Sequence, residues 1–123
     1  MIEQILDCWK NSTYDFRQTA NRNDPLCHRF ADWVECYRLK RAIANVLRPG
    51  SILEIGVRYG YSAMAFLDGS PGSRYLGIDL DADTFGGSKG ALDWARGAMC
   101  ALPADFVVAD SQKMSRFPGG LTI

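Results

Sequence analysis

Apolar residues recur at helical spacing in the first 50 residues of the chain. Residues 1–10 are predicted to form a short amphipathic helix, whose apolar face consists of Ile2, Ile5, Leu6 and Trp9. After a polar stretch, Asp24 and Pro25 are predicted to begin a second helix, because an aspartate can cap it and proline is tolerated in the first turn. This helix extends to Arg48, where Pro49-Gly50 ends it. Its expected inward stripe comprises Trp33, Cys36, Leu39, Ile43, Val46 and Leu47.

From residue 51 onward the pattern changes to short apolar runs, each followed by a helical stretch. Strands are predicted over 51–55, 74–80 and 105–109, and helices over 61–67 and 88–102. Ser88 is the predicted N-cap of the second of these helices. Strands separated by helices cannot be joined by tight hairpins, so we expect parallel strands connected by right-handed crossovers. The order predicts an α/β fold with a Rossmann-like, doubly wound parallel sheet. A fourth strand is predicted to open at Leu121.

Composition narrows the classes of function. The 123 residues are 47% hydrophobic and 23% charged, which is typical of a folded globular chain. Fourteen basic residues balance fourteen acidic ones, so the chain lacks the concentrated basic face that nucleic-acid binding needs. No apolar stretch approaches the ~18 residues of a membrane span, and the N-terminus lacks a signal pattern. We therefore expect a cytoplasmic protein without nucleic-acid or membrane partners.

The cysteines follow neither a metal-binding nor a disulfide pattern. The chain has four, Cys8, Cys27, Cys36 and Cys100, and no two of them form a C-x-x-C pair. The single histidine, His28, directly follows Cys27, and the chain has no second pair of closely spaced Cys or His residues. Structural zinc sites need two such pairs. The sequence therefore predicts reduced thiols and no metal ligand.

The end of the first strand is rich in glycine and polar residues. The segment from Glu54 to Ser62 contains Gly56 and Gly60, four residues apart between the strand and the helix. Such a turn allows a ligand to lie against backbone N–H groups and a helix N-terminus. The dinucleotide motif G-x-G-x-x-G needs glycine where Arg58 stands, and an arginine side chain would crowd a pyrophosphate. A nicotinamide cofactor is therefore disfavoured.

The other two strands end in acidic and polar residues. Asp79 lies at the end of the second strand, 23 residues after Gly56, close to the interval of about 20 residues at which an acid contacts ribose hydroxyls in nucleoside-binding α/β folds. Asp110, Ser111 and Gln112 follow the third strand and can donate and accept hydrogen bonds at the rim of an adenine pocket. Because ligands bind at the carboxyl ends of parallel strands, these residues predict a nucleoside site.

The three motifs together resemble the cofactor-binding motifs of class I S-adenosylmethionine-dependent methyltransferases. The resemblance covers residues 51–112 and is nearest to small-molecule O-methyltransferases of the catechol and caffeoyl-CoA type, and to related sugar and antibiotic methyltransferases. It implies that the glycines lie under the methionine part, that Glu54 fixes their loop, and that Ser62 touches the methionine carboxylate. Asp79 would hold the ribose hydroxyls, and the third motif would border the adenine. The implied cofactor contacts are Glu54, Gly56, Gly60, Ser62, Asp79, Asp110, Ser111 and Gln112.

The resemblance also divides the chain. Residues 1–50 become an N-terminal helical segment, and residues 51–123 become the first half of an S-adenosylmethionine-binding, Rossmann-like domain. Members of that family have about seven strands with the first strand in the centre, so the sheet predicted here is incomplete after its third strand. Because an open edge promotes aggregation, we expect a longer chain that continues the sheet. The alternative is a homo-oligomer in which a second chain covers the edge.

The resulting hypothesis is an S-adenosylmethionine-dependent methyltransferase that transfers a methyl group to an oxygen atom of a small-molecule or sugar-like acceptor. An NAD(P)-dependent oxidoreductase domain and a non-catalytic nucleoside-binding module are the alternatives. In the similar O-methyltransferases, the catalytic base and the acidic ligands of a divalent metal follow the fourth and later strands. The sequence therefore nominates no catalytic residue and no metal ligand, and metal dependence stays open.

Overall fold

The computed structural model describes residues 1–114 of the chain. Its helices are α1 (Ile2–Lys10), α2 (Phe30–Leu47), α3 (Tyr61–Gly69) and α4 (Ala91–Ala98). Its strands are β1 (Ser51–Ile55), β2 (Arg74–Asp79) and β3 (Ala104–Val108), and its 3-10 turns are η1 (Phe16–Gln18), η2 (Cys27–Arg29) and η3 (Ser111–Lys113). The predicted alternation of strands and helices after residue 50 is confirmed. The strand predicted to open at Leu121 lies outside the described residues.

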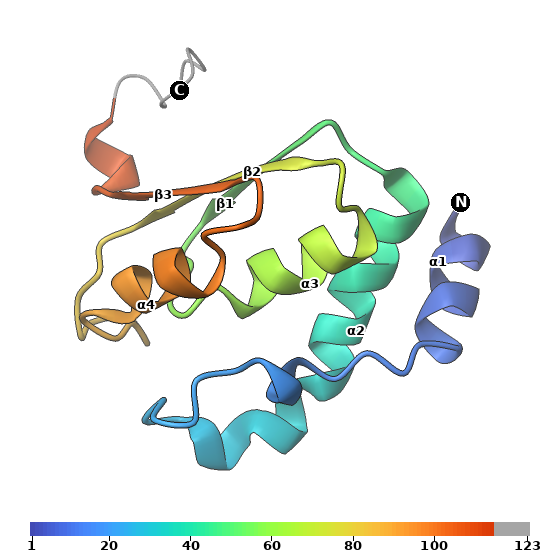
Figure 1. The fold of residues 1–123 in the computed structure, drawn as a ribbon, viewed down its shortest axis with the longest axis horizontal. Coiled ribbons are helices and arrows are strands. Elements are labelled where there is room, and N and C mark those ends of the chain that lie inside the picture. Colours follow the sequence, from blue (N-terminus) through green and yellow to red (C-terminus); the bar gives the residue numbers. More distant parts are fainter. Residues whose placement is uncertain (115–123) are drawn as a thin grey trace.

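The three strands form one open, parallel sheet with β2 in the middle. Glu54, Gly77 and Phe106 are aligned across it. Parallel neighbours need crossover connections, and α3 and α4 provide them (Figure 1). The carboxyl ends of all three strands therefore lie at the same end of the sheet. This arrangement is α/β and compatible with a Rossmann-like fold.

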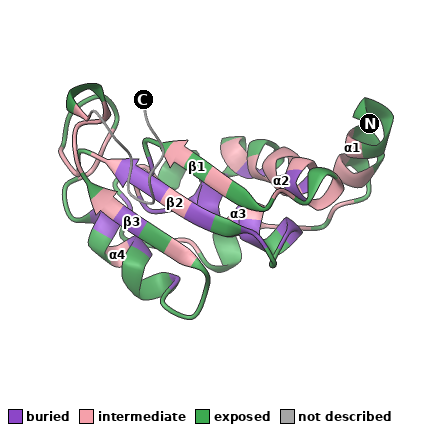
Figure 2. Ribbon diagram, turned by 90° about the horizontal axis from the view of Figure 1, so that it is seen from above, coloured by how far each residue is buried: buried purple, intermediate pink, exposed green. Residues whose placement is uncertain are grey.

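Among the described residues, helices cover one face of the sheet and leave the other open. Both α3 and α4 lie on the same side of the strands (Figure 1), over an apolar cluster of Val57, Ala63, Leu67, Tyr75, Leu92, Ala95, Met99 and Phe106. On the other face, which Figure 2 shows from above, Leu53 is 37% exposed and Ile55 is 58% exposed. The second helical layer of a doubly wound sheet is not present among residues 1–114. Of the predicted fold, the α/β arrangement with a parallel sheet is confirmed.

Helix α2 packs against α3 through small residues. A Cβ atom on Gly69 would lie 2.2 Å from a backbone carbonyl oxygen of α2, so only glycine allows this close approach. Ala42 and Ala44 of α2 are buried, whereas Cys36 and Leu47 are exposed. The predicted inward stripe of this helix is therefore partly wrong. The residues that α2 buries are Phe30, Val34, Ala42 and Ala44.

The N-terminal segment and the sheet share a second apolar cluster. This cluster consists of Phe16, Phe30, Val34, Tyr59, Tyr61 and Ala91. The Tyr61 ring centroid lies 5.4 Å from that of Phe16 and 5.5 Å from that of Phe30. The boundary at residue 50 thus marks a change of sequence pattern, and packing continues across it.

The fourth helix is shorter than predicted. It spans Ala91–Ala98, where the sequence pattern indicated 88–102. Asp81, in the preceding loop, accepts N–H bonds from Gly90 at 3.0 Å and Leu92 at 3.3 Å. Because this more distant carboxylate caps the helix, the nearer Ser88 is not its N-cap.

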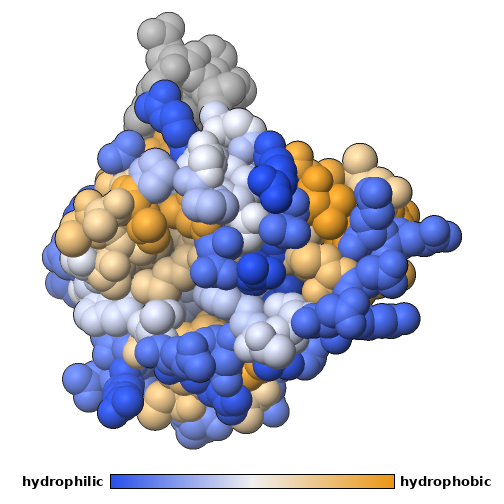
Figure 3. Space-filling model, turned by 45° about the vertical axis from the view of Figure 1, so that its right-hand side comes forward, coloured by the Kyte–Doolittle hydropathy of each residue, from blue (hydrophilic) through white to orange (hydrophobic). Residues whose placement is uncertain are grey.

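The surface mixes polar and apolar areas. Figure 3 shows hydrophobic areas broken up by hydrophilic ones on the face turned toward the viewer. In the part of the chain that the structure describes, every helix is too short or too polar to cross a bilayer.

Candidate functional site

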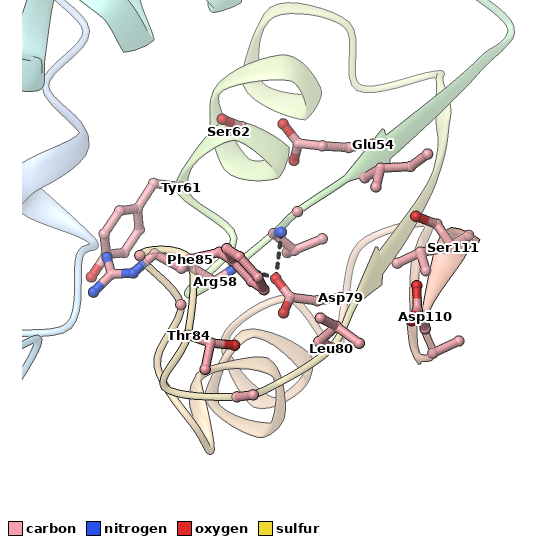
Figure 4. Close-up of a pocket in the computed structure, with 18 of the residues that line it drawn as sticks. Glu54, Arg58, Tyr61, Ser62, Asp79, Leu80, Thr84, Phe85, Asp110 and Ser111 are labelled. Atoms are coloured by element: carbon pink, nitrogen blue, oxygen red, sulfur yellow. Dashed lines mark hydrogen bonds between the residues drawn. The ribbon is translucent and has the colours of Figure 1, made fainter. Parts of the chain in front are cut away.

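A cavity of about 590 Å³ opens at the carboxyl ends of the three strands (Figure 4). Its size falls within the range of roughly 300–1,000 Å³ that is usual for small-molecule sites. Seven of the eight predicted contacts line it, namely Glu54, Gly56, Ser62, Asp79, Asp110, Ser111 and Gln112. The parallel topology therefore brings residues of all three motifs to one place.

Gly60, the eighth predicted contact, is not among the residues that line this cavity. It precedes α3 with a φ of +80°, and a Cβ atom there would lie 2.3 Å from Cε of Met99 and 3.2 Å from Cβ of Ala95. Gly56 has a φ of +86° and open space around its Cα. The two glycines thus serve different purposes: Gly56 turns the backbone beside the cavity, and Gly60 allows α3 to approach α4.

Asp79 holds the loop that follows β1. Its Oδ2 accepts N–H bonds from Val57 at 2.6 Å and Arg58 at 2.8 Å (Figure 4). Its Oδ1 accepts one from Asp81 at 2.8 Å. Burial by itself would raise the pKa of Asp79, but these backbone bonds and the Arg58 charge outweigh it and hold the pKa below its ordinary value. A carboxylate offers about four acceptor positions, so one remains on Oδ1. Asp79 can therefore accept one ribose hydroxyl hydrogen where the sequence suggested two.

Four backbone N–H groups of this loop, those of Gly56, Val57, Arg58 and Gly60, are used within the protein. Gly56 donates to a carbonyl oxygen of β2 at 2.8 Å, and Gly60 donates to that of Val57 at 3.1 Å. The N–H groups of Val57 and Arg58 donate to Asp79. Phosphate-binding loops instead turn such N–H groups toward the anion. This loop is therefore a poor receptor for a pyrophosphate.

Arg58 is tied to the N-terminal segment by a buried ion pair. Its guanidinium donates two hydrogen bonds to Asp24, at 2.8 and 3.0 Å, and the Tyr61 hydroxyl donates to the same carboxylate at 2.9 Å. The Asp24 side chain is fully buried, which favours its neutral form, yet its bonds to Arg58, Leu26 N–H and Tyr61 lower its pKa. As predicted, the Asp24 carboxylate accepts a backbone N–H bond, from Leu26 at 2.9 Å, at the start of the turns that lead into η2. The predicted bounds differ, because α2 itself begins only at Phe30.

Glu54 and Lys40 belong to the wall formed by β1, α2 and α3. Glu54 Oε1 accepts a hydrogen bond from the Tyr75 hydroxyl at 2.5 Å, and Lys40 Nζ donates to Ser62 Oγ at 2.6 Å. The Lys40 ammonium also lies 5.5 Å from the ring centroid of Tyr37. Burial raises the pKa of Glu54, and the Tyr75 hydroxyl and the Lys40 charge only partly oppose it. This wall thus presents an acidic and a basic group to the same cavity.

The opposite wall consists of the loop between β2 and α4 and the residues after β3. Asp110 accepts the N–H bond of Gln112 at 3.0 Å and so begins η3. Phe85 lines the cavity although it is 97% exposed, and its φ of +54° lies in the left-handed region. Its aromatic ring therefore stands at the rim of the cavity with almost no protein contact.

Sequence reasoning missed several residues that line the cavity, among them Tyr37, Lys40 and Phe85. Local sequence patterns explain Lys40 as a cation that suits the C-terminal half of a helix. For Phe85 they indicate only a loop between a strand and a helix. Nothing within one helix indicates that it packs beside a loop 20 residues later. Only the contact between α2 and α3 reveals the position of Lys40.

Within residues 1–114, no group of three or more His, Cys, Asp or Glu side chains is placed to hold a metal ion. All four cysteines are free thiols. No family model matches the chain, and no curated protein or solved structure matches it. The functional interpretation therefore depends on the geometry of the site itself.

Proposed function

We propose that this chain binds S-adenosylmethionine and forms the cofactor-binding part of a methyltransferase. The observation that supports this most is the convergence of three motifs, from three successive strand ends, on one cavity of suitable size. The resemblance of those motifs to O-methyltransferases supplies the acceptor class, an oxygen atom of a small-molecule or sugar-like compound.

The residues around the cavity fit the chemistry of this cofactor. Glu54 and Ser62 border the part expected to take the methionine end, and Asp79 keeps one acceptor position for a ribose hydroxyl. Asp110 and its neighbours offer donors and acceptors for the adenine edge. S-adenosylmethionine supplies an electrophilic methyl group on a sulfonium, and a lining with three carboxylates is suited to a cationic ligand.

The described residues contribute binding and orientation. Methyl transfer is an in-line displacement, so an enzyme accelerates it mainly by aligning the nucleophile with the methyl carbon. The side chains named here would hold the nucleoside and the amino-acid end on opposite sides of the cavity. None of residues 1–114 is assigned as a base or as a metal ligand.

A dinucleotide cofactor fits this site less well. The loop N–H groups that would bind its pyrophosphate already donate to Asp79 and to backbone carbonyl oxygens. The carboxylates of Glu54, Asp79 and Asp110 would face a second anion. An NAD(P)-dependent oxidoreductase is therefore the weaker proposal. A non-catalytic module would bind the same nucleosides and would differ only in lacking transfer activity.

Calorimetric titration of the 123-residue chain tests the proposal. We expect S-adenosylmethionine and S-adenosylhomocysteine to bind and NAD to give no heat of binding. Asp79→Ala should weaken S-adenosylhomocysteine binding by about 1–3 kcal/mol, because it removes a charged acceptor and frees the loop. Asp105→Ala removes an exposed acid of β3 that does not line the cavity and should leave the affinity unchanged. Binding of NAD alone, or of none of the three, contradicts the proposal.

A further inference from the structure

Two cationic side chains from the described part of the chain line the cavity, Lys40 and Arg58. Arg58 is neutralised by Asp24 at 2.8 Å. Lys40 has no carboxylate oxygen within 4.0 Å among residues 1–114, and its Nζ instead donates to the neutral hydroxyl of Ser62. Its positive charge therefore remains available to a ligand.

Glu54 supplies the opposite charge on the same wall. One of its oxygens, Oε1, is bound by the Tyr75 hydroxyl at 2.5 Å, which orients the carboxylate. Lys40 and Glu54 influence each other electrostatically, yet they are not in direct contact as an ion pair. Both line the cavity, together with Ser62 in the first turn of α3. A positive and a negative group thus face one space from neighbouring elements without forming a direct ion pair.

We propose that Lys40 and Glu54 form a site for the zwitterionic end of an α-amino acid, in which Lys40 binds the carboxylate and Glu54 binds the ammonium group. This inference rests on the proposed function, and it gives α2 of the N-terminal segment a direct part in ligand recognition. A ligand that ends in a phosphate would be attracted by Lys40 but repelled by Glu54. The same pair therefore selects an amino-acid end against a phosphate end.

Three nucleoside ligands separate the two charges. S-adenosylhomocysteine has both the carboxylate and the ammonium group, its decarboxylated analogue has the ammonium group only, and 5′-methylthioadenosine has neither. On the unmodified chain, calorimetry should show the tightest binding for S-adenosylhomocysteine. Lys40→Met removes the charge and keeps an unbranched side chain one atom shorter. It should weaken S-adenosylhomocysteine binding about 10- to 100-fold, the worth of one hydrogen bond to a charged group. It should leave the other two ligands within about twofold.

Two further variants serve as comparisons. Glu54→Gln should weaken both ammonium-bearing ligands and spare 5′-methylthioadenosine. Lys10→Met makes the same substitution at an exposed lysine on α1, away from the cavity, and should change no affinity. The ligand series on the unmodified chain tests the carboxylate contact even if Lys40→Met does not fold.

The outcomes separate the two proposals. Equal affinity of the unmodified chain for S-adenosylhomocysteine and its decarboxylated analogue overturns the inference and leaves the proposed function standing. So does a Lys40→Met variant that weakens all three ligands alike, because Lys40 would then act only by supporting Ser62 and α3. If none of the three ligands binds to the unmodified chain, the proposed function fails, and this inference fails with it.

Discussion

The two walls of the cavity are built in contrasting ways. On the wall with Arg58 and Asp79, the polar groups are paired within the protein, and Asp24 lies fully buried behind them. On the opposite wall, Phe85 is 97% exposed, and both it and Gly86 have left-handed backbones. The first wall has its shape before a ligand arrives, whereas few contacts hold the second. Changes on the first wall should therefore alter stability, whereas changes on the second should alter ligand binding with little effect on stability, and four experiments test this contrast.

The largest effect is expected from the buried ion pair. Asp24→Asn leaves the Arg58 charge without its partner and should lower the free energy of unfolding by about 3–5 kcal/mol, measured by urea denaturation. Asp93→Asn is the matched control, since the Asp93–Arg96 pair has the same 2.8 Å separation but lies at the surface. Its loss should not exceed about 1 kcal/mol. Equal losses in the two variants would show that burial of the first pair has no energetic consequence.

The next effect concerns the two glycines. Gly60→Ala and Gly56→Ala both place a Cβ in a left-handed conformation, but only the first brings it within 2.3 Å of Met99. Because Met99 is itself buried, Gly60→Ala should cost about 1–3 kcal/mol more than Gly56→Ala in the same denaturation assay. If Gly56→Ala proved the more damaging, the packing role assigned to Gly60 would be wrong.

A smaller effect is expected from pH. The folded pKa values of Asp24 and Asp79 lie below their ordinary value of 3.8, so their stabilisation is present above that pH and is lost as the pH falls through the folded values. Glu54 behaves in the opposite sense. Its pKa is raised above 4.5, so its stabilisation is present below that pH and is lost as the pH rises through the folded value.

Denaturation midpoints recorded between about pH 2 and pH 7 measure these slopes. Asp24→Asn should flatten the acid side of the stability profile, and Glu54→Gln should remove the decline that begins above pH 4.5. An unchanged acid side in Asp24→Asn would mean that other carboxyl groups control acid unfolding.

The smallest effect on stability is expected on the second wall. Phe85→Ala should change the free energy of unfolding by less than about 0.5 kcal/mol, because the ring has almost no contacts to lose. If the ring closes on a bound nucleoside, S-adenosylhomocysteine should bind about 0.5–1.5 kcal/mol more weakly, and Phe85→Tyr should retain the wild-type affinity. A Phe85→Ala variant that unfolds easily would contradict the contrast between the walls.

Predictions from the sequence succeed where the signal is local. The strands at 51–55 and 105–109 were within one residue of β1 and β3, since a short apolar run between turn residues has few other interpretations. The motif residues after each strand also reach the cavity, with the exception of Gly60, because parallel strands place their carboxyl ends together. Local signals failed at Ser88, where the more distant Asp81 caps the helix, and they gave no sign that Asp24 also pairs with Arg58.

The amino-acid sequence by itself determined the alternation of strands and helices after residue 50 and the polar character of each strand end. Both follow from periodicity and turn chemistry over a few residues. Only the tertiary structure decided that Asp24 pairs with Arg58, 34 residues away, and that Lys40 reaches the cavity beside Ser62. Such contacts depend on how closely helices approach one another. At α2 and α3 that distance is set by Gly69 and by small buried alanines, whose effect no short stretch of sequence reveals.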